Sequence, residues 1–207
     1  MSQIKIVSEK YLEPLRKVFI ILLFFVCSCS LSVDLNNVWI SKNINVDKKV
    51  VLLKKSKVLV TYVRSKYKNM AYNGARILFE KLKKEKLAKS VFFYFNKEGK
   101  ISSELIDYAK KLNFDCLIIV EIEYVFYGSY LSSSRVIEKI SLFDIKNNKN
   151  TVLCEGNFCS VGTPVENVDI MFADIREKRA PSVVYLMDLN AEEFLQKIKE
   201  TIKNEQR

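Results

Sequence analysis

The sequence contains no histidine, and it has only five glycines and three prolines. The lack of histidine excludes Ser-His-Asp and Cys-His catalytic sites and zinc sites with imidazole ligands. The glycines, at positions 74, 99, 128, 156 and 162, are scattered, so neither a dinucleotide-binding Gly-rich turn nor a P-loop is present. We therefore expect no catalytic residue of these classes, no cofactor and no metal site.

Arginine is scarce as well, because 27 of the 34 basic residues are lysines. Nucleic-acid-binding surfaces usually contain clustered arginines, whose planar guanidinium binds phosphate and guanine in a bidentate manner. The net charge is +10 on 207 residues, and we interpret the lysines as a solvated surface without a nucleic-acid partner. Attraction to an anionic membrane or to cell wall is the alternative. The hydrophobic fraction of 49% is that of an ordinary globular domain.

Long hydrophobic runs are also missing, and the longest one is the nine-residue stretch 18–26. A nine-residue helix is about 14 Å long, about half the hydrocarbon thickness of a bilayer, so this stretch is too short to span a membrane. Basic residues precede it at Lys5, Lys10, Arg16 and Lys17. A basic segment followed by a short apolar run is typical of a secretory signal peptide.

The apolar run ends in Val26-Cys27-Ser28-Cys29, which resembles the lipobox of bacterial lipoproteins. Val26 takes the aliphatic position, Ser28 the small position before the cleaved bond and Cys29 the lipidated position, whereas Cys27 departs from the usual Ala or Ser. The resemblance implies a signal peptide of residues 1–28, a membrane anchor through lipid on Cys29, and location in the bacterial cell envelope, on its periplasmic face. An ordinary core segment with two chance cysteines is the alternative.

Residues 29–49 follow the anchor and are predicted to form a polar tether. Within it, Trp39 and Ile40 are expected to dock on the folded part of the chain. The folded part is predicted to begin at residue 50, with a short strand at 50–53.

The central part of the chain alternates between β-branched or aromatic segments and segments with helical periodicity. This pattern predicts strands at 57–64, 91–95 and 114–125, with helices at 73–89 and 103–113 between them. Two successive strand–helix–strand units require parallel pairing with right-handed crossovers. The strand at 114–125 is continuously apolar in its centre, and we place it in the middle of the sheet.

In the last third of the chain, the alternation of strands and helices gives way to two consecutive strands. Alternating segments at 135–145 and 151–159 predict an antiparallel hairpin. Thr163, followed by Pro164, predicts the start of a helix, and a final helix is predicted at 190–203 after an ambiguous stretch. The whole predicts a single α/β domain over residues 50–207. Its mixed sheet contains two strand–helix–strand units followed by the hairpin and C-terminal helices.

Two stretches resemble the TolB amino-terminal domain and the CsgG-type lipoproteins. In the first, 105–120, a helix ending in alanine and two basic residues leads through Asn113 and Asp115 into a buried strand; the family usually has glycine at the Asn113 position. In the second, 140–149, Asp144 precedes a turn. The resemblance implies a periplasmic envelope lipoprotein that assembles with other envelope proteins and is not an enzyme.

The remaining cysteines are candidates for structural roles. Cys116 lies in the most apolar strand and is interpreted as a buried, inert thiol. Cys154 and Cys159 would form a disulfide if residues 156–157 made a tight turn. If the strand instead runs straight, which we favour, the two cysteines lie on opposite faces of the sheet.

Glu121 and Glu123 are the candidate catalytic pair, because they share one face of a strand and paired carboxylates hydrolyse glycosidic bonds. We interpret them instead as the point where the strand emerges into solvent.

The aromatic residues Tyr124, Phe126, Tyr127 and Tyr130 are predicted to contact a protein partner or a membrane surface, or else to pack on the end of the sheet. We expect a lipid-anchored, non-enzymatic module that binds or assembles envelope components, with a protein partner in the envelope. The alternatives are a carboxylate-dependent cell-wall hydrolase and a carrier of an apolar ligand held between sheet and helices.

Overall fold

A computed structural model describes residues 38–63, 66–129, 131–146, 150–169, 174–178 and 180–206, all within one compact unit. The predicted signal peptide, with Ser28 and Cys29, lies outside the described residues. In chain order the elements are β1 (Val38–Val46), the 3₁₀ helix η1 (Lys48–Lys55), β2 (Lys57–Tyr62), α2 (Lys68–Glu85), β3 (Ser90–Phe93), α3 (Ser102–Lys111), β4 (Cys116–Phe126), β5 (Ser134–Asp144), β6 (Thr151–Gly162), β7 (Val165–Asp169), β8 (Asp174–Lys178) and α4 (Val183–Asn204).

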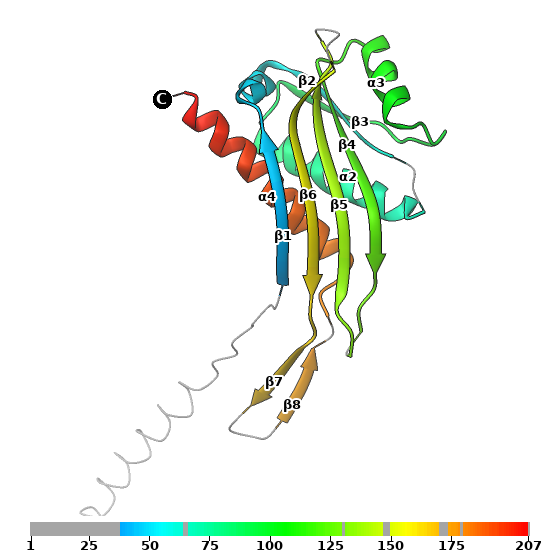
Figure 1. Cartoon of the computed structure of the whole chain (residues 1–207), viewed down its shortest axis with the longest axis vertical. Helices are drawn as coiled ribbons and strands as arrows, with labels where there is room; N and C mark the ends of the chain where they lie inside the picture. Colours follow the sequence, from blue (N-terminus) through cyan, green and yellow to red (C-terminus); the bar gives the residue numbers. More distant parts are fainter. Residues whose placement is uncertain are drawn as a thin grey trace, which may run out of the picture. The chain divides into compact units, whose positions relative to one another are not determined.

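A six-stranded mixed sheet with the order β1-β6-β5-β4-β2-β3 organises these elements (Figure 1). β2 pairs in parallel with β3 on one side and with β4 on the other, as the two strand–helix–strand units require. β5 pairs antiparallel with β4 and with β6. The predicted α/β class, the mixed sheet and the internal position of β4 are confirmed.

Helices α2 and α4 cover one face of the sheet, and α3 covers part of the other (Figure 1). The larger core lies under α2 and α4, where Leu78 and Phe194 are fully buried against inward residues such as Ile118 and Ile140. The smaller core lies under α3 and contains Leu117 among its members. α3 packs over β2 and β4, and none of the described helices covers the same face of β5, β6 and β1. We call this the open face.

The folded part starts earlier than we expected. Residues 38–46, assigned to a tether from their polarity, form the edge strand β1, which pairs antiparallel along its whole length with residues 154–162 of β6. The reason is a period-two pattern in which Val38, Ile40 and Ile44 pack against the core, whereas Trp39, Ser41 and Asn43 are exposed. Ile40 docks as expected, but Trp39 does not. The segment at 50–53 is part of η1 and not a strand.

The predicted helix beginning at Thr163 is wrong. Residues Val165–Asp169 and Asp174–Lys178 pair antiparallel as β7 and β8. The Thr-Pro start signal is local, and the β-branched residues that follow it favour an extended pairing whenever a partner strand is available.

The final helix is longer than predicted, because it begins at Val183 and not at residue 190. Ser182 provides the start, since its hydroxyl accepts a hydrogen bond from the Tyr185 backbone N–H at 3.2 Å. α2 also begins earlier than predicted, at Lys68 instead of 73. Asn113, at the family's usual glycine, has φ 55°, so this position is left-handed as the resemblance implies.

Candidate functional site

At one end of the sheet, a row of directly paired residues crosses four neighbouring strands and has a large aromatic side chain at each end. Trp39 in β1 lies opposite Val161 in β6, Val161 opposite Arg135 in β5, and Arg135 opposite Phe126 in β4. Directly paired residues point to the same side of a sheet, and Trp39 alternates with core-facing neighbours, so this row lies on the open face. β1 starts and β4 ends here, at the lower end of the sheet in Figure 1.

The side chains at this end are exposed. Trp39 is 63% exposed, Phe126 45%, Tyr127 60% and Leu131 91%, and together these four define the aromatic end. Tyr124, two residue pairs further into the sheet, is 39% exposed and contacts the Tyr67 ring edge-on at a centroid distance of 6.4 Å. The predicted contact residues Tyr124, Phe126 and Tyr127 are therefore accessible, while Tyr130 lies outside the described residues.

Serine side chains hold the loop that carries Tyr127 and Leu131. The Ser129 hydroxyl accepts from the Leu131 backbone N–H at 3.1 Å and lies 2.9 Å from the Ser132 hydroxyl. The Ser134 hydroxyl accepts from the Gly128 N–H at 3.0 Å. A Cβ at Gly128 would lie 2.4 Å from the Ser134 backbone nitrogen, so the close approach of the backbone at these two residues requires glycine. Leu131 is thus presented to solvent by a hydrogen-bonded turn.

Sequence reasoning missed Trp39 as a member of this site. Its neighbours in the chain are polar, which led us to interpret the segment as a tether. The signal that could have found it is the alternation of Val38 and Ile40 around it, because two inward residues place the one between them outward.

A β-bulge separates the two candidate catalytic carboxylates. The register between β4 and β5 shifts between Ile122 and Tyr124, and Ile122 and Val125 both face the core although the spacing between them is odd. Glu123 is the extra residue and is exposed, whereas Glu121 is half-buried opposite Lys139. The bulge therefore interrupts the regular two-residue alternation between Glu121 and Glu123.

The cysteines of the described residues are free. β6 runs straight through Cys154 and Cys159, which lie on opposite faces, so the favoured prediction is confirmed. Burial raises the pKa of the Cys116 thiol to about 11 and that of Cys154 to about 12, which keeps both protonated and poorly nucleophilic. The Cys159 sulfur lies 3.4 Å from the guanidinium of Arg135.

Asp115, the aspartate of the family-like stretch, has a structural role. One of its carboxylate oxygens accepts the Lys57 backbone N–H at 2.8 Å, and the other pairs with the Lys146 ammonium at 2.9 Å. The hydrogen bond from Lys57, followed by the contacts with Lys146, holds the pKa of this carboxyl below its usual value. Asp115 therefore ties the start of β4 to the start of β2.

A buried polar cluster lies between the sheet and the helices. Glu138 of β5 is 1% exposed and accepts a hydrogen bond from the Asn190 side-chain amide at 2.8 Å. The Asn190 carbonyl accepts from the Ser160 hydroxyl of β6. Burial raises the pKa of Glu138 to about 8, against the smaller opposite effect of the Asn190 bond. A Cβ at Gly74 would lie 2.8 Å from the Glu138 carboxyl, so glycine allows α2 to approach it.

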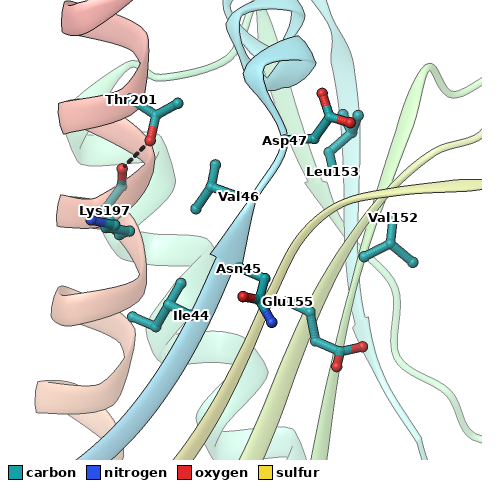
Figure 2. Close-up of a pocket in the computed structure, with 9 residues that line it drawn as sticks. All are labelled: Ile44, Asn45, Val46, Asp47, Val152, Leu153, Glu155, Lys197 and Thr201. Carbon is teal, nitrogen blue, oxygen red and sulfur yellow. Dashed lines mark hydrogen bonds between the residues drawn. The ribbon is translucent and has the colours of Figure 1, made fainter.

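A groove of about 650 Å³ lies where the edge strand β1 meets α4 and β6 (Figure 2). Figure 2 shows Ile44 and Val46 on the α4 side, near Lys197 and Thr201, with Glu155 on the β6 side. Glu155 pairs with Lys139 at 3.0 Å, and its pKa is lowered mainly by that contact. This surface groove mixes charged and apolar groups, unlike the enclosed apolar cavity between sheet and helices that a carrier would need.

Two further observations concern the described residues alone. They contain no cluster of three or more cysteine or acidic side chains able to hold a metal ion. Among them, no helix is both long and apolar enough to cross a membrane.

Comparisons with known proteins find solved structures with a similar fold, but no protein of similar sequence. No protein-family model and no curated protein matches the chain. The solved PelC dodecamer from Paraburkholderia phytofirmans is similar over 79% of this chain and 97% of that chain, with 11% identity and a TM-score of 0.52. A second PelC dodecamer structure from this organism gives a TM-score of 0.50, again at 11% identity over 79% of this chain and 98% of that chain.

A third solved structure, lipoprotein GNA1162 from Neisseria meningitidis, covers 70% of this chain and 99% of its own at 13% identity, with a TM-score of only 0.39. At these identities the PelC likeness shows a shared fold and says nothing by itself about activity. The fold of this chain is therefore one that PelC also adopts.

Proposed function

We propose that the protein is a bacterial envelope lipoprotein, anchored through lipid on Cys29, whose α/β domain binds or assembles envelope components without catalysing a reaction. The observation that carries the proposal is Val26-Cys27-Ser28-Cys29 at the end of a basic and then apolar amino terminus. A diacylglyceryl group and an N-linked acyl chain on one cysteine supply more than one lipid chain, enough for stable attachment.

The domain itself supports a binding or assembly role more than an enzymatic one. Five exposed apolar side chains lie at one end of the sheet: Trp39, Tyr124, Phe126, Tyr127 and Leu131. In contrast, its candidate carboxylates are separated by a bulge and its buried thiols are kept protonated. The PelC proteins that share its fold were solved as dodecamers, which is compatible with assembly in several copies.

Fatty-acid labelling of the full chain in a bacterial host tests the anchor. Wild type should incorporate label and mature to a shorter form, and Cys29→Ala should lose the label and accumulate as an uncleaved precursor. Cys27→Ala is the matched control, because it removes a thiol two residues away and should leave labelling intact. Equal labelling of Cys29→Ala and wild type would contradict the proposal.

Cross-linking of the lipidated chain in intact envelopes tests the assembly role. Species larger than one chain are expected, containing this protein with other copies or with envelope proteins. Recovery of monomer alone, with Cys29 labelled and the domain folded, would show that the anchored domain acts without assembling.

A further inference from the structure

The arrangement of the side chains at the aromatic end suits contact with a membrane surface. Trp39 and Phe126 lie at the two ends of a row of four directly paired residues on neighbouring strands. With strands about 4.8 Å apart, the row is about 14 Å wide. Tyr127 and Leu131 continue it on the adjoining turn. The result is a mainly apolar strip across this end of the sheet, with Arg135 within it.

The chemistry of the strip matches a bilayer interface. Tryptophan and tyrosine favour the headgroup level of membranes, where the ring meets apolar chains and its polar atom stays hydrated. Arg135, within the row, is exposed and places a guanidinium beside these side chains. A guanidinium pairs well with phosphate oxygens such as those of lipid headgroups.

The chain itself limits where the strip can be. Nine residue steps separate Cys29 from Val38, so a fully extended segment reaches at most about 32 Å. Trp39 is the next residue, at the start of β1, while the opposite end of β1, Val46, lies seven residue steps further along the strand. Of the two ends of the sheet, the aromatic end is therefore the one that a lipid on Cys29 keeps close to the bilayer.

We infer that the aromatic end docks on the surface of the same membrane that holds the lipid anchor, with Trp39 and Phe126 at the headgroup level. This inference rests on the anchor proposed above. Docking would orient the sheet with the groove at the opposite end of β1 directed away from the membrane, free for a partner.

The single tryptophan makes the inference directly measurable. The full lipidated chain is reconstituted in vesicles of phosphatidylethanolamine and phosphatidylglycerol, with or without bromine on the acyl chains. Brominated lipid should quench the fluorescence of Trp39 by at least twofold, with emission shifted to shorter wavelength. The control combines Trp39→Phe with Leu52→Trp, which moves the reporter to an exposed position in η1 beyond the far end of β1, where quenching should be slight.

Each outcome separates the two proposals. If Cys29 carries no fatty acid, the anchor fails and the docking fails with it. If Cys29 is labelled but Trp39 is quenched no more than the reporter at position 52, the docking alone is wrong. A blue-shifted Trp39 that brominated lipid does not quench would place a second copy of the chain on this surface, and would also overturn the inference.

Discussion

The two faces of the sheet differ in how they are completed. On the face beneath α2 and α4, inward residues such as Ile118, Ile140 and Phe194 are fully or almost fully buried within the chain. On the open face, the strands β5, β6 and β1 expose Trp39 and Arg135 at one end. The covered face supplies the larger of the two hydrophobic cores, whereas the open face leaves these side chains exposed.

The two faces of the sheet also differ in how their charged side chains are paired and hydrated. On the covered face Glu138 is buried, and among the described residues it has a hydrogen bond from the Asn190 amide but no cationic partner. The open face pairs Lys139 with Glu155 in partial contact with water. A buried carboxyl pays a desolvation cost that a half-exposed ion pair largely avoids, so charge changes should matter far more on the covered face.

The largest contrast is expected from truncating one aromatic residue on each face. Phe194→Ala removes a fully buried ring from the larger core and should lower the free energy of unfolding by about 3–5 kcal/mol. Trp39→Ala removes a ring that is mostly in water and should change it by less than about 1 kcal/mol. Urea denaturation of both variants measures the difference. Similar losses would show that β1 depends on Trp39 for its docking.

The next effect is a pH dependence that comes from Glu138. Its folded pKa, about 8, is above its unfolded value of 4.5, so the proton favours the folded state. This stabilisation is fully present below pH 4.5 and is lost as pH rises through about 8. With no histidine in the chain, the free energy of unfolding should fall by up to about 1.4 kcal/mol per pH unit between pH 5 and 8.

Glu138→Gln should remove this slope, because the amide cannot ionise. Denaturation of wild type and variant at several pH values from 5 to 9 measures it, and Glu155→Gln, on the open face, is the matched control that should keep it. A wild-type curve that is flat over this range would mean that Glu138 is charged in the fold and stabilised by groups other than Asn190.

The smallest effect is expected for the open-face carboxylates. Replacing Glu121 and Glu123 together with alanine should change the free energy of unfolding by about 0.5 kcal/mol or less, and should leave any assembly in the envelope intact. Denaturation and cross-linking of the double variant measure the two properties. A large loss of biological function in a normally folded variant would revive the hydrolase alternative.

Much of the fold could be predicted because its signals are local or periodic. The switch between period two and period 3.6 located β2, α2, β3, α3 and β4. The left-handed residue Asn113 was indicated by the family-like stretch, since asparagine tolerates the conformation that the usual glycine adopts. Alternation along β5 and β6 predicted their antiparallel pairing.

The failures arose where a local signal was overruled by a partner distant in sequence. Thr163 and Pro164 are compatible with a helix start, but strand pairing between β7 and β8 satisfies the same backbone. Likewise, the polar composition around Trp39 indicated a tether, although β6, more than a hundred residues away, makes the segment a strand. Pairing energies of this kind depend on the partner and not on the segment alone.

For the candidate site, the sequence by itself determined the lipobox-like residues before Cys29, the exposed aromatic group around Phe126 and the absence of histidine chemistry. The tertiary structure decided that Trp39 joins Phe126 across four strands and that Glu138 is buried beside Asn190. Those juxtapositions come from register and helix docking, which bring together residues that have no relation along the chain. Side-chain chemistry can be recognised within one segment, but its neighbours are set by the burial of the sheet as a whole.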